Sequence, residues 1–597
     1  MKALTSPLVL AVGLTLSGFA QATETPLVKL PGSEIVGVFY QGVESFFGIP
    51  YAEPPTGLNR LKRPVRRTLP LGLLDASTPA ERCYQGHFPV TPLDYYPWDE
   101  NESAESVRSF NETFGIHGPR GYPRVEITQE DCLTVTVQRP AGTKEGDNLP
   151  VLFMIQGYGF VVGGAPGHST TSFLNFGVEN NQPFILVTAN YRMGVWGFLP
   201  GKEVMANKTA NLGLYDQRMS MQWTSDNIKA FGGDPDRITL WGEGSGGVSV
   251  LSHLVINDGN ATYNGRQLFH GAIMSSGSLM LAEYPDAKRP QEVYDKIVHA
   301  AGCSEREDSL QCLREITPAR LAISSAAVLG SSSVEALRLQ FIPRPDGELI
   351  RYSPEVHLNR GTFLQVPMII GNQEDEGTIF AKVRPLFEVK KNETFDSYLR
   401  RQYFYNLPEA NLQRFTSLYS DRPEDGSPYR TQLTPIDEQW HDRKRIASIL
   451  GDLFFVFPRR LAMFLIAASH PSVPLWGYQG SQEYDKSISR GGLLGTAHGS
   501  FEKNAIAFEF DKEDFLLGIP PEENYSTASI RTYMINFMYN LDPNKGVGIY
   551  QPEVWTKWKL DDAQLLWINK TRNGYIYDDA RAEQYKVMLG ELDLLRL

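Results

Sequence analysis

Short apolar runs recur along the chain and are separated by longer segments of mixed polarity. They are rich in aliphatic, β-branched and aromatic residues, and they occupy residues 149–155, 183–191, 237–242, 269–276 and 366–372. Continuous apolar runs of this length are typical of strands that are buried on both faces of a sheet. Between them, residues 214–231 have the pattern of a helix. This alternation predicts an α/β fold with a large, mostly parallel central sheet and helices on both faces.

The N-terminal residues have the features of a secretory signal peptide. A lysine at position 2 precedes an apolar run at 8–16, and Ala-Gln-Ala follows at 20–22. The apolar run is too short to cross a bilayer, which takes about 20 helical residues. The charged segment 581–597 does not resemble a membrane anchor or a lipid-anchor signal. We expect a signal peptide at 1–22, one α/β domain at 23–597, no membrane span, and location outside the cell or in the secretory-pathway lumen.

Cysteines and glycosylation sequons fit an oxidising compartment. The chain has four cysteines, and sequence order favours the disulfides Cys83–Cys132 and Cys303–Cys312, although four cysteines can also pair in other ways. The sequence contains no Cys-x-x-Cys pair, and we expect neither a metal nor a cofactor. Sequons that predict N-glycosylation of a secreted chain begin at Asn101, Asn111, Asn207, Asn260, Asn392, Asn524 and Asn569.

Composition narrows the class of partner. With 42% hydrophobic and 21% charged residues, the 597-residue chain has the composition of a globular protein. Lys+Arg total 57 and Asp+Glu total 69, so the formal net charge is -12, which argues against a nucleic-acid partner. The 31 Phe, 27 Tyr and 9 Trp supply aromatic side chains for a large core and for a binding site. Composition alone does not separate an enzyme from a binding protein.

Several segments along the chain resemble the type-B carboxylesterase and cholinesterase-like lipase family of α/β-hydrolases. In chain order they are FFGIPYAEPPTGLNRLKRP at 46–64, EDCLTVTV at 130–137, NYRMGVWGFL at 190–199, the long run at 211–243, IIGNQEDEG at 369–377 and LLGTAHG at 493–499. The resemblance covers nearly the whole chain after the signal peptide. It implies the α/β-hydrolase fold and a catalytic triad in the chain order serine, acid, histidine.

The position of the nucleophilic serine is altered in this sequence. The family's serine lies in a strained strand-to-helix turn, with small residues two positions away on either side. Here the turn reads Gly242-Glu243-Gly244-Ser245-Gly246, so Gly244 occupies the serine position and Ser245 follows it. A register with Ser245 at the turn would put Glu243 where a small residue is needed. We therefore expect the turn to persist without its serine hydroxyl, and Ser245 to act as nucleophile only in an active enzyme.

The remaining catalytic elements are partly retained. The resemblance implies that Glu376 is the acid of the triad and His498 its base, a pair that we expect to be vestigial. The glycine-rich loop that forms the oxyanion hole in the family reads Gln156-Gly157-Tyr158-Gly159-Phe160, with tyrosine at its central glycine. Tyr158, Gly159 and Ser245 are expected to face a bound ligand.

The segment between Cys83 and Cys132 is long for a closed loop and borders the active-site entrance in relatives. Long loops are often functional. Its aromatic residues can either receive a planar ligand or pack the loop on the body; they are Phe88, Tyr95, Tyr96, Trp98, Phe110, Phe114 and Tyr122.

These changes lead us to expect a secreted, non-catalytic carboxylesterase-like protein that binds an aromatic or apolar small molecule or a partner protein. The resemblance to serine-less fungal relatives implies a dirigent-like auxiliary, which steers oxidative phenol coupling by a multicopper oxidase in polyketide secondary metabolism. One alternative is an active carboxylic ester hydrolase that uses Ser245 with His498 and Glu376. Others are an adhesion-type binding protein, and lyase or isomerase chemistry through His498.

Overall fold

The computed structural model describes most of the chain after the predicted signal peptide. The described residues are 25–85, 128–165, 170–329, 337, 339–381, 394–434, 437, 441–482, 495–496, 498, 505, 525–548, 550–569 and 571–597. Three groups of residues lie outside these ranges: the predicted signal peptide, the seven aromatic residues between Cys83 and Cys132 that were considered for ligand binding, and the sequons at Asn101, Asn111, Asn392 and Asn524.

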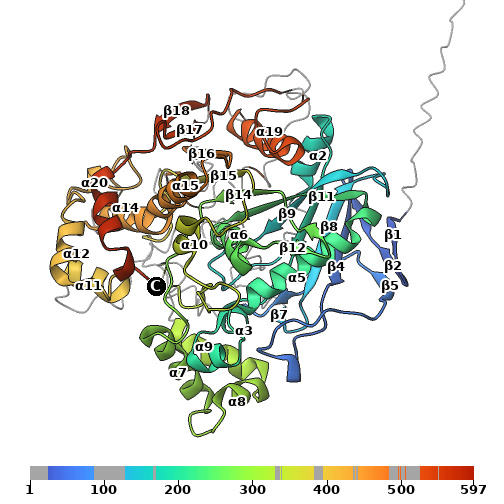
Figure 1. Ribbon diagram of the computed structural model, residues 1–597, viewed down its shortest axis with the longest axis horizontal. Helices are drawn as coiled ribbons and strands as arrows, with labels where there is room; N and C mark the ends of the chain where they lie inside the picture. The colour runs from blue at the N-terminus through green and yellow to red at the C-terminus, as the bar shows by residue number, and fades with distance from the viewer. Residues whose placement is uncertain are drawn as a thin grey trace, which may run out of the picture.

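A mixed sheet of eleven strands forms the centre of the molecule (Figure 1). Its order is β18-β17-β16-β15-β14-β11-β9-β10-β8-β4-β3. The strands from β10 to β17 pair in parallel, whereas the pairs at both edges are antiparallel. The bounds are β3 Val38–Tyr40, β4 Val43–Pro50, β8 Thr134–Pro140, β9 Leu149–Ile155, β10 Ile185–Ala189, β11 Gly233–Glu243, β14 Gly271–Ser275, β15 Met368–Gln373, β16 Leu475–Gly480, β17 Gln564–Ile568 and β18 Gly574–Tyr577.

Helices cover both faces of the sheet. Side chains alternate between the two faces along each strand, so an apolar strand exposes apolar residues on both faces, and both must be buried. In β9, Leu152 and Met154 join one core cluster, and Val151 and Phe153 join another. The cluster of Leu152 includes residues of α2 and α19, whereas the cluster of Val151 includes residues of α5, α6 and α15. The covering helices are α2 Thr171–Glu179, α19 Tyr525–Asn540, α5 Leu212–Asn227, α6 Ser245–Val255 and α15 Phe457–Ser469.

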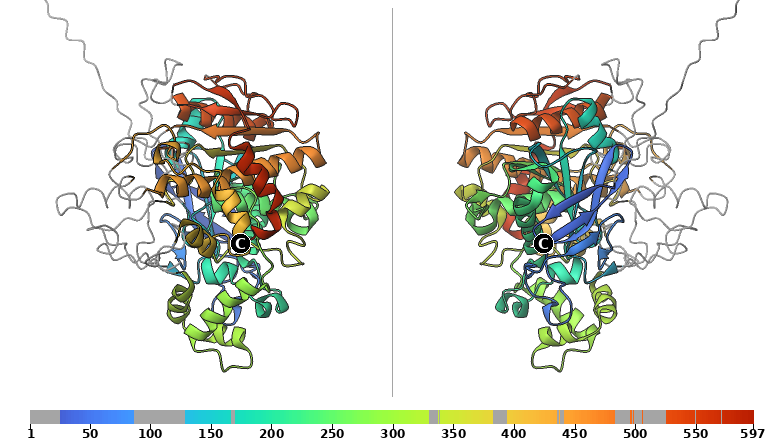
Figure 2. Two further views of the ribbon diagram at one scale, coloured as in Figure 1. Left: turned by 90° about the vertical axis from the view of Figure 1, so that its left-hand side faces the viewer. Right: turned by 90° about the vertical axis from the view of Figure 1, so that its right-hand side faces the viewer.

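Smaller helices extend the body at two places. The helices α7, α8 and α9 lie together at one end of the molecule (Figures 1 and 2). A third core cluster joins α11, α12, α14 and α20 to the start of α15. The bounds are α7 Lys288–Ala301, α8 Ser309–Glu315, α9 Pro318–Leu329, α10 Pro354–Arg360, α11 Phe395–Gln402, α12 Glu409–Thr416, α14 Arg443–Gly451 and α20 Ala582–Gly590, with the short helices α3 Gly194–Phe198 and α4 Lys202–Ala206.

Three small sheets complete the described structure. The first contains β1, β2 and β5, and the other two are the pairs β6·β7 and β12·β13. Their bounds are β1 Leu27–Leu30, β2 Ser33–Val36, β5 Gly72–Asp75, β6 Arg82–Cys83, β7 Thr128–Gln129, β12 Thr262–Tyr263 and β13 Arg266–Gln267.

The predicted fold class is confirmed, and the five predicted strands correspond to β9, β10, β11, β14 and β15. The predicted helix corresponds to α5 with the short 3₁₀ helix Ile228–Phe231 that follows it. Both predicted disulfides are confirmed, and all cysteines of the chain are paired. No helix in the described part of the chain combines the length and apolarity that a bilayer crossing requires.

Candidate active site

A sharp turn connects β11 to α6 at the carboxyl edge of the parallel strands. Gly244 is the turn residue, with φ 57° and ψ −122°, and α6 begins at the next residue. The amide of Gly244 donates to the Ser275 carbonyl oxygen of β14 at 2.9 Å. A backbone of this kind strains residues that have a side chain and costs glycine little. The geometry therefore places Gly244, and not Ser245, at the apex of the turn.

Close backbone contacts explain why small residues flank this apex. A Cβ placed on Gly242 would lie 2.2 Å from backbone atoms of Gly246, and one placed on Gly246 would lie 2.1 Å from the Ile155 carbonyl oxygen. Gly157 is equally confined, since its Cβ would lie 2.2 Å from the Glu243 carbonyl oxygen. The strand, the turn and the glycine-rich loop are thus pressed together without room for side chains.

Glu376 and His498 meet beside this turn. His498 Nδ1 lies 2.7 Å from Glu376 Oε2, and the other carboxylate oxygen accepts a hydrogen bond from the Gln373 amide at 2.6 Å. Glu376 is 1% exposed and lies three residues after the end of β15. A carboxylate held in this way orients the imidazole and stabilises the positive charge that the ring acquires when it takes a proton.

The second nitrogen of His498 faces Gly244. A Cβ placed on Gly244 would lie 2.9 Å from His498 Nε2, which is the direction in which a serine side chain would point. Nε2 is also 3.9 Å from Oε1 of the buried Glu243. Carboxylates therefore lie near both ring nitrogens. Burial raises the pKa of Tyr478 well above its ordinary value, and the charges of Glu376 and Glu243 add to this shift, so its phenol stays neutral beside them.

Two phenylalanines pack on the imidazole of His498. The ring centroid of Phe455 is 4.7 Å from that of His498, and the centroid of Phe380 is 5.3 Å away. Phe455 belongs to the π-helical turn Asp452–Val456 between α14 and α15. Such turns often occur at functional sites. Sequence reasoning missed Glu243, Phe380 and Phe455 as parts of the site. Of these three residues, only Glu243 could have been found from the sequence, because it directly precedes Gly244 in the turn motif.

The glycine-rich loop lies next to the turn in an unusual conformation. Tyr158, Gly159 and Phe160 have φ values of 77°, 70° and 63°. The side chain of Phe160 is buried, whereas Tyr158 is 38% exposed. The Phe160 carbonyl oxygen accepts a hydrogen bond from the Gly194 amide at 2.7 Å. The tyrosine thus occupies a left-handed backbone position without being buried in the core.

Ser245 is the first residue of α6 and is 7% exposed. Its Oγ accepts a hydrogen bond from the Phe160 amide at 3.2 Å. The hydroxyl therefore bridges the helix start and the glycine-rich loop. The structure brings Gly244, Ser245, Tyr158, Gly159, Glu376 and His498 into one region, as a triad-like arrangement requires.

The fold and this site define the class of α/β-hydrolases, with an acid–base pair facing a strand-to-helix turn. Comparison with known proteins identifies the family: residues 24–588 match the carboxylesterase family. The chain belongs to this family.

Three relatives that cover most of this chain are named as lipases. The secreted triacylglycerol lipase LIP1 of Gibberella zeae is 40% identical, over 94% of this chain and 89% of the lipase. Secreted lipase 1 of Botryotinia fuckeliana is 36% identical, with coverages of 96% and 93%, and lipase 4 of Diutina rugosa is 34% identical, with coverages of 94% for both chains. The crystal structure of EstA from Aspergillus niger has a TM-score of 0.73 at 23% identity, covers 96% of this chain and 99% of its own, and supports the fold.

These relatives correct the main functional prediction. A non-catalytic, dirigent-like auxiliary to a multicopper oxidase was expected, but that prediction is wrong, because the relatives are named as lipases and favour the alternative of an ester hydrolase. That prediction rested on the missing side chain at Gly244. The acid–base pair beside it is intact, with His498 Nδ1 2.7 Å from the buried Glu376 carboxylate.

Proposed function

We propose that the protein is a secreted carboxylic ester hydrolase of the lipase type. The observation that carries the proposal is the buried Glu376–His498 pair, in which the second ring nitrogen of His498, Nε2, faces the β11–α6 turn. The similarity to two lipases that are named as secreted supports both the activity and the location. Within this proposal, His498 is the general base and Glu376 holds its tautomer.

The nucleophile that we assign is Ser245. Its hydroxyl adjoins the turn, but the Cβ direction that faces His498 belongs to Gly244. For attack, Ser245 Oγ must leave the Phe160 amide and turn toward His498 Nε2. That exchange releases a backbone N–H in the glycine-rich loop, which can then donate to the carbonyl oxygen that becomes negatively charged during attack. Because this rearrangement costs free energy, we expect slower turnover than an enzyme with serine at the apex would show.

The test compares the purified wild-type protein with Ser245→Ala and His498→Ala on p-nitrophenyl esters and triacylglycerol emulsions. We expect measurable turnover in the wild type and a loss of at least about a hundredfold in His498→Ala. Absence of ester turnover in a folded wild-type protein would overturn the proposed function.

A fluorophosphonate probe tests the nucleophile separately. Covalent labelling that disappears in Ser245→Ala supports the assignment. Turnover that persists in Ser245→Ala, without labelling of the wild type, would refute Ser245 as the nucleophile and indicate attack by a water molecule that His498 deprotonates.

A further inference from the structure

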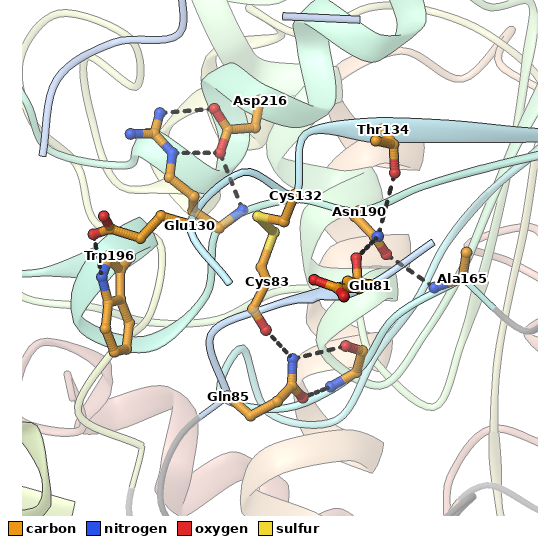
Figure 3. Close-up of a disulfide and its surroundings, with 12 residues drawn as sticks. Glu81, Cys83, Gln85, Glu130, Cys132, Thr134, Ala165, Asn190, Trp196 and Asp216 are labelled. Carbon is orange, nitrogen blue, oxygen red and sulfur yellow. Dashed lines mark hydrogen bonds and ion pairs between the residues drawn. A yellow bond between two sulfur atoms is a disulfide. The ribbon is translucent and has the colours of Figure 1, made fainter. Parts of the chain in front are cut away.

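The side chain of Gln85 joins the Cys83–Cys132 disulfide to the segment that follows the glycine-rich loop (Figure 3). Its Nε2 donates to the Cys83 carbonyl oxygen at 2.7 Å and to the Gly163 carbonyl oxygen at 3.0 Å. Its Oε1 accepts from the Gly163 amide at 2.6 Å. One half-buried side chain therefore satisfies both backbone groups of Gly163, much as a neighbouring strand would.

Gly163 lies directly behind the glycine-rich loop. Its φ is 133°, and a Cβ placed on it would lie 3.2 Å from the Gly157 carbonyl oxygen and 3.5 Å from Cδ2 of Tyr158. A displacement of Gly163 would therefore reach the loop through direct contact. The connection runs from the disulfide through Gln85 and Gly163 to Gly157 and Tyr158.

A second side chain joins the same two segments. Asn190 donates from Nδ2 to the Glu81 carbonyl oxygen at 3.1 Å, and its Oδ1 accepts from the Ala165 amide at 3.1 Å (Figure 3). The segments 81–85 and 163–165 are thus held together by side-chain amides from both sides.

The glycine-rich loop needs such support. Tyr158 and Phe160 hold left-handed backbone conformations that residues with side chains rarely adopt. Conformations of this kind persist only where surrounding contacts impose them. Directly after the loop, the Val161 and Val162 amides approach the Tyr158 carbonyl oxygen only at 3.4 and 3.5 Å, which is long for a hydrogen bond.

We propose that Gln85 is a positioning residue of the active site, which holds the glycine-rich loop in register with the β11–α6 turn. The inference rests on the proposed ester hydrolysis for its kinetic consequence. Its structural consequence, a loop that depends on Gln85, is independent of any activity.

The experiment compares Gln85→Ala and Gln85→Glu with the wild type and with Gln584→Ala. Gln584 is a matched control, because it is also half-buried and donates to a backbone carbonyl oxygen, that of Leu418, at 2.7 Å. Hydrogen exchange is measured for peptides that cover 157–164, together with thermal unfolding and ester kinetics.

For Gln85→Ala we expect faster exchange at 157–164, a kcat lower by about tenfold and an unchanged KM, since a misplaced oxyanion donor affects the transition state more than the bound substrate. Gln85→Glu should also exchange faster than the wild type, because its carboxylate can accept from the Gly163 amide but sets its second oxygen against the carbonyl oxygens of Cys83 and Gly163. Gln584→Ala should match the wild type in hydrogen exchange at 157–164 and in kcat.

Unchanged exchange at 157–164 in a folded Gln85→Ala protein would overturn the proposal. An equal loss of kcat in Gln85→Ala and in the control Gln584→Ala would also overturn it. If the wild type lacks ester turnover, the proposed function fails, while the exchange measurement still decides whether Gln85 positions the loop.

Discussion

At the scale of single residues, the absence of a side chain at Gly244 has the largest consequence for catalysis. The backbone of Gly244 retains the angles of a nucleophile turn, and its missing Cβ would point at His498 Nε2. The backbone and the imidazole are arranged as a serine at this position would require, but the space is too small. A Cβ at 244 would lie 2.9 Å from His498 Nε2, which is too short for a carbon–nitrogen contact. Because the nearby atom is at the end of a side chain, a small shift of the imidazole would relieve this contact.

We therefore expect Gly244→Ser to raise the turnover of p-nitrophenyl esters by at least about tenfold over the wild type, since it places a hydroxyl in line with the general base. The positive φ should cost about 1–2 kcal/mol of unfolding free energy. Gly244→Ala is the control, with the same backbone cost and no hydroxyl. Equal rates for the serine and alanine variants would show that the 244 side chain does not reach the reacting carbonyl.

The buried His253 should make the fold sensitive to acid. It lies in α6, and its Nε2 is 2.9 Å from Gln217 Oε1. Burial, with a smaller contribution from Arg218, lowers the pKa of His253 to about 3. The folded state thus binds fewer protons than the unfolded state below pH about 6.5, so stability is lost as the pH falls. Above that pH, this histidine gives no pH dependence.

Urea unfolding at pH 7 and pH 4.5 measures the effect, and we expect His253 to account for a loss of about 2–3 kcal/mol. His253→Leu should flatten the profile over this range. The unfolding free energy of His253→Leu should still fall somewhat as the pH is lowered, because burial also lowers the pKa values of His270 and His357. A variant whose pH profile matches that of the wild type would contradict the assignment.

At the scale of elements, Asp375 holds together the loops that carry the acid and the base. Its Oδ1 accepts from Ser427 Oγ at 2.8 Å and from the Tyr429 amide at 2.9 Å. Its Oδ2 accepts from Thr496, from the amide at 3.1 Å and from Oγ1 at 3.0 Å. Burial raises the pKa of Asp375, and these donors oppose the shift. Thr496 precedes His498 by two residues, so the carboxylate fixes the histidine loop onto the end of β15.

Asp375→Asn should destabilise the protein by about 1–3 kcal/mol, because its NH₂ group must face donors where the carboxylate accepts. We also expect a lower kcat on short-chain esters, since the position of His498 depends on this loop. Asp425→Asn is the control, as Asp425 accepts from Ser420 and Arg422 in an exposed turn. Thermal unfolding that is equal for the two variants would refute the role of Asp375.

At the scale of the whole molecule, a buried ion pair connects distant parts of the chain. Arg459 in α15 donates to both oxygens of Asp578, which follows β18, and to Asn372 Oδ1 of β15 at 2.7 Å. Arg460 also donates to Asp578, at 3.0 Å. Burial alone would raise the pKa of Asp578, but the two arginines outweigh it and lower the value. This cluster fixes the C-terminal strand to the helix that covers the sheet.

Asp578→Asn should cost about 3–5 kcal/mol of unfolding free energy, because it leaves the guanidinium groups buried without a countercharge. Denaturant unfolding monitored by tryptophan fluorescence measures the loss. A cost below about 1 kcal/mol, which is typical of exposed pairs, would show that the cluster is hydrated in solution.

Much of the central sheet could be predicted because its middle strands contain runs of consecutive apolar residues, such as Val151–Ile155 in β9 and Met368–Ile370 in β15. The outer strands were not predicted: β4 and β8 contain polar residues at buried positions such as Ser45 and Gln138, and β16 contains two glycines. Tertiary partners satisfy these groups, for example the hydrogen bond from Gln138 to Ser45 Oγ at 3.1 Å. A local apolar pattern cannot reveal such partners.

The sequence by itself determined the fold class and the family motifs and favoured the two disulfide pairs, because these depend on local patterns and on the order of segments. Only the tertiary structure decided which atoms meet. It set His498 Nδ1 at 2.7 Å from Glu376 Oε2, although the two residues are 122 positions apart in the chain. It also showed that Gln85 holds Gly163 behind the glycine-rich loop. The directions of individual side chains arise from packing between segments distant in the chain, which no local pattern encodes.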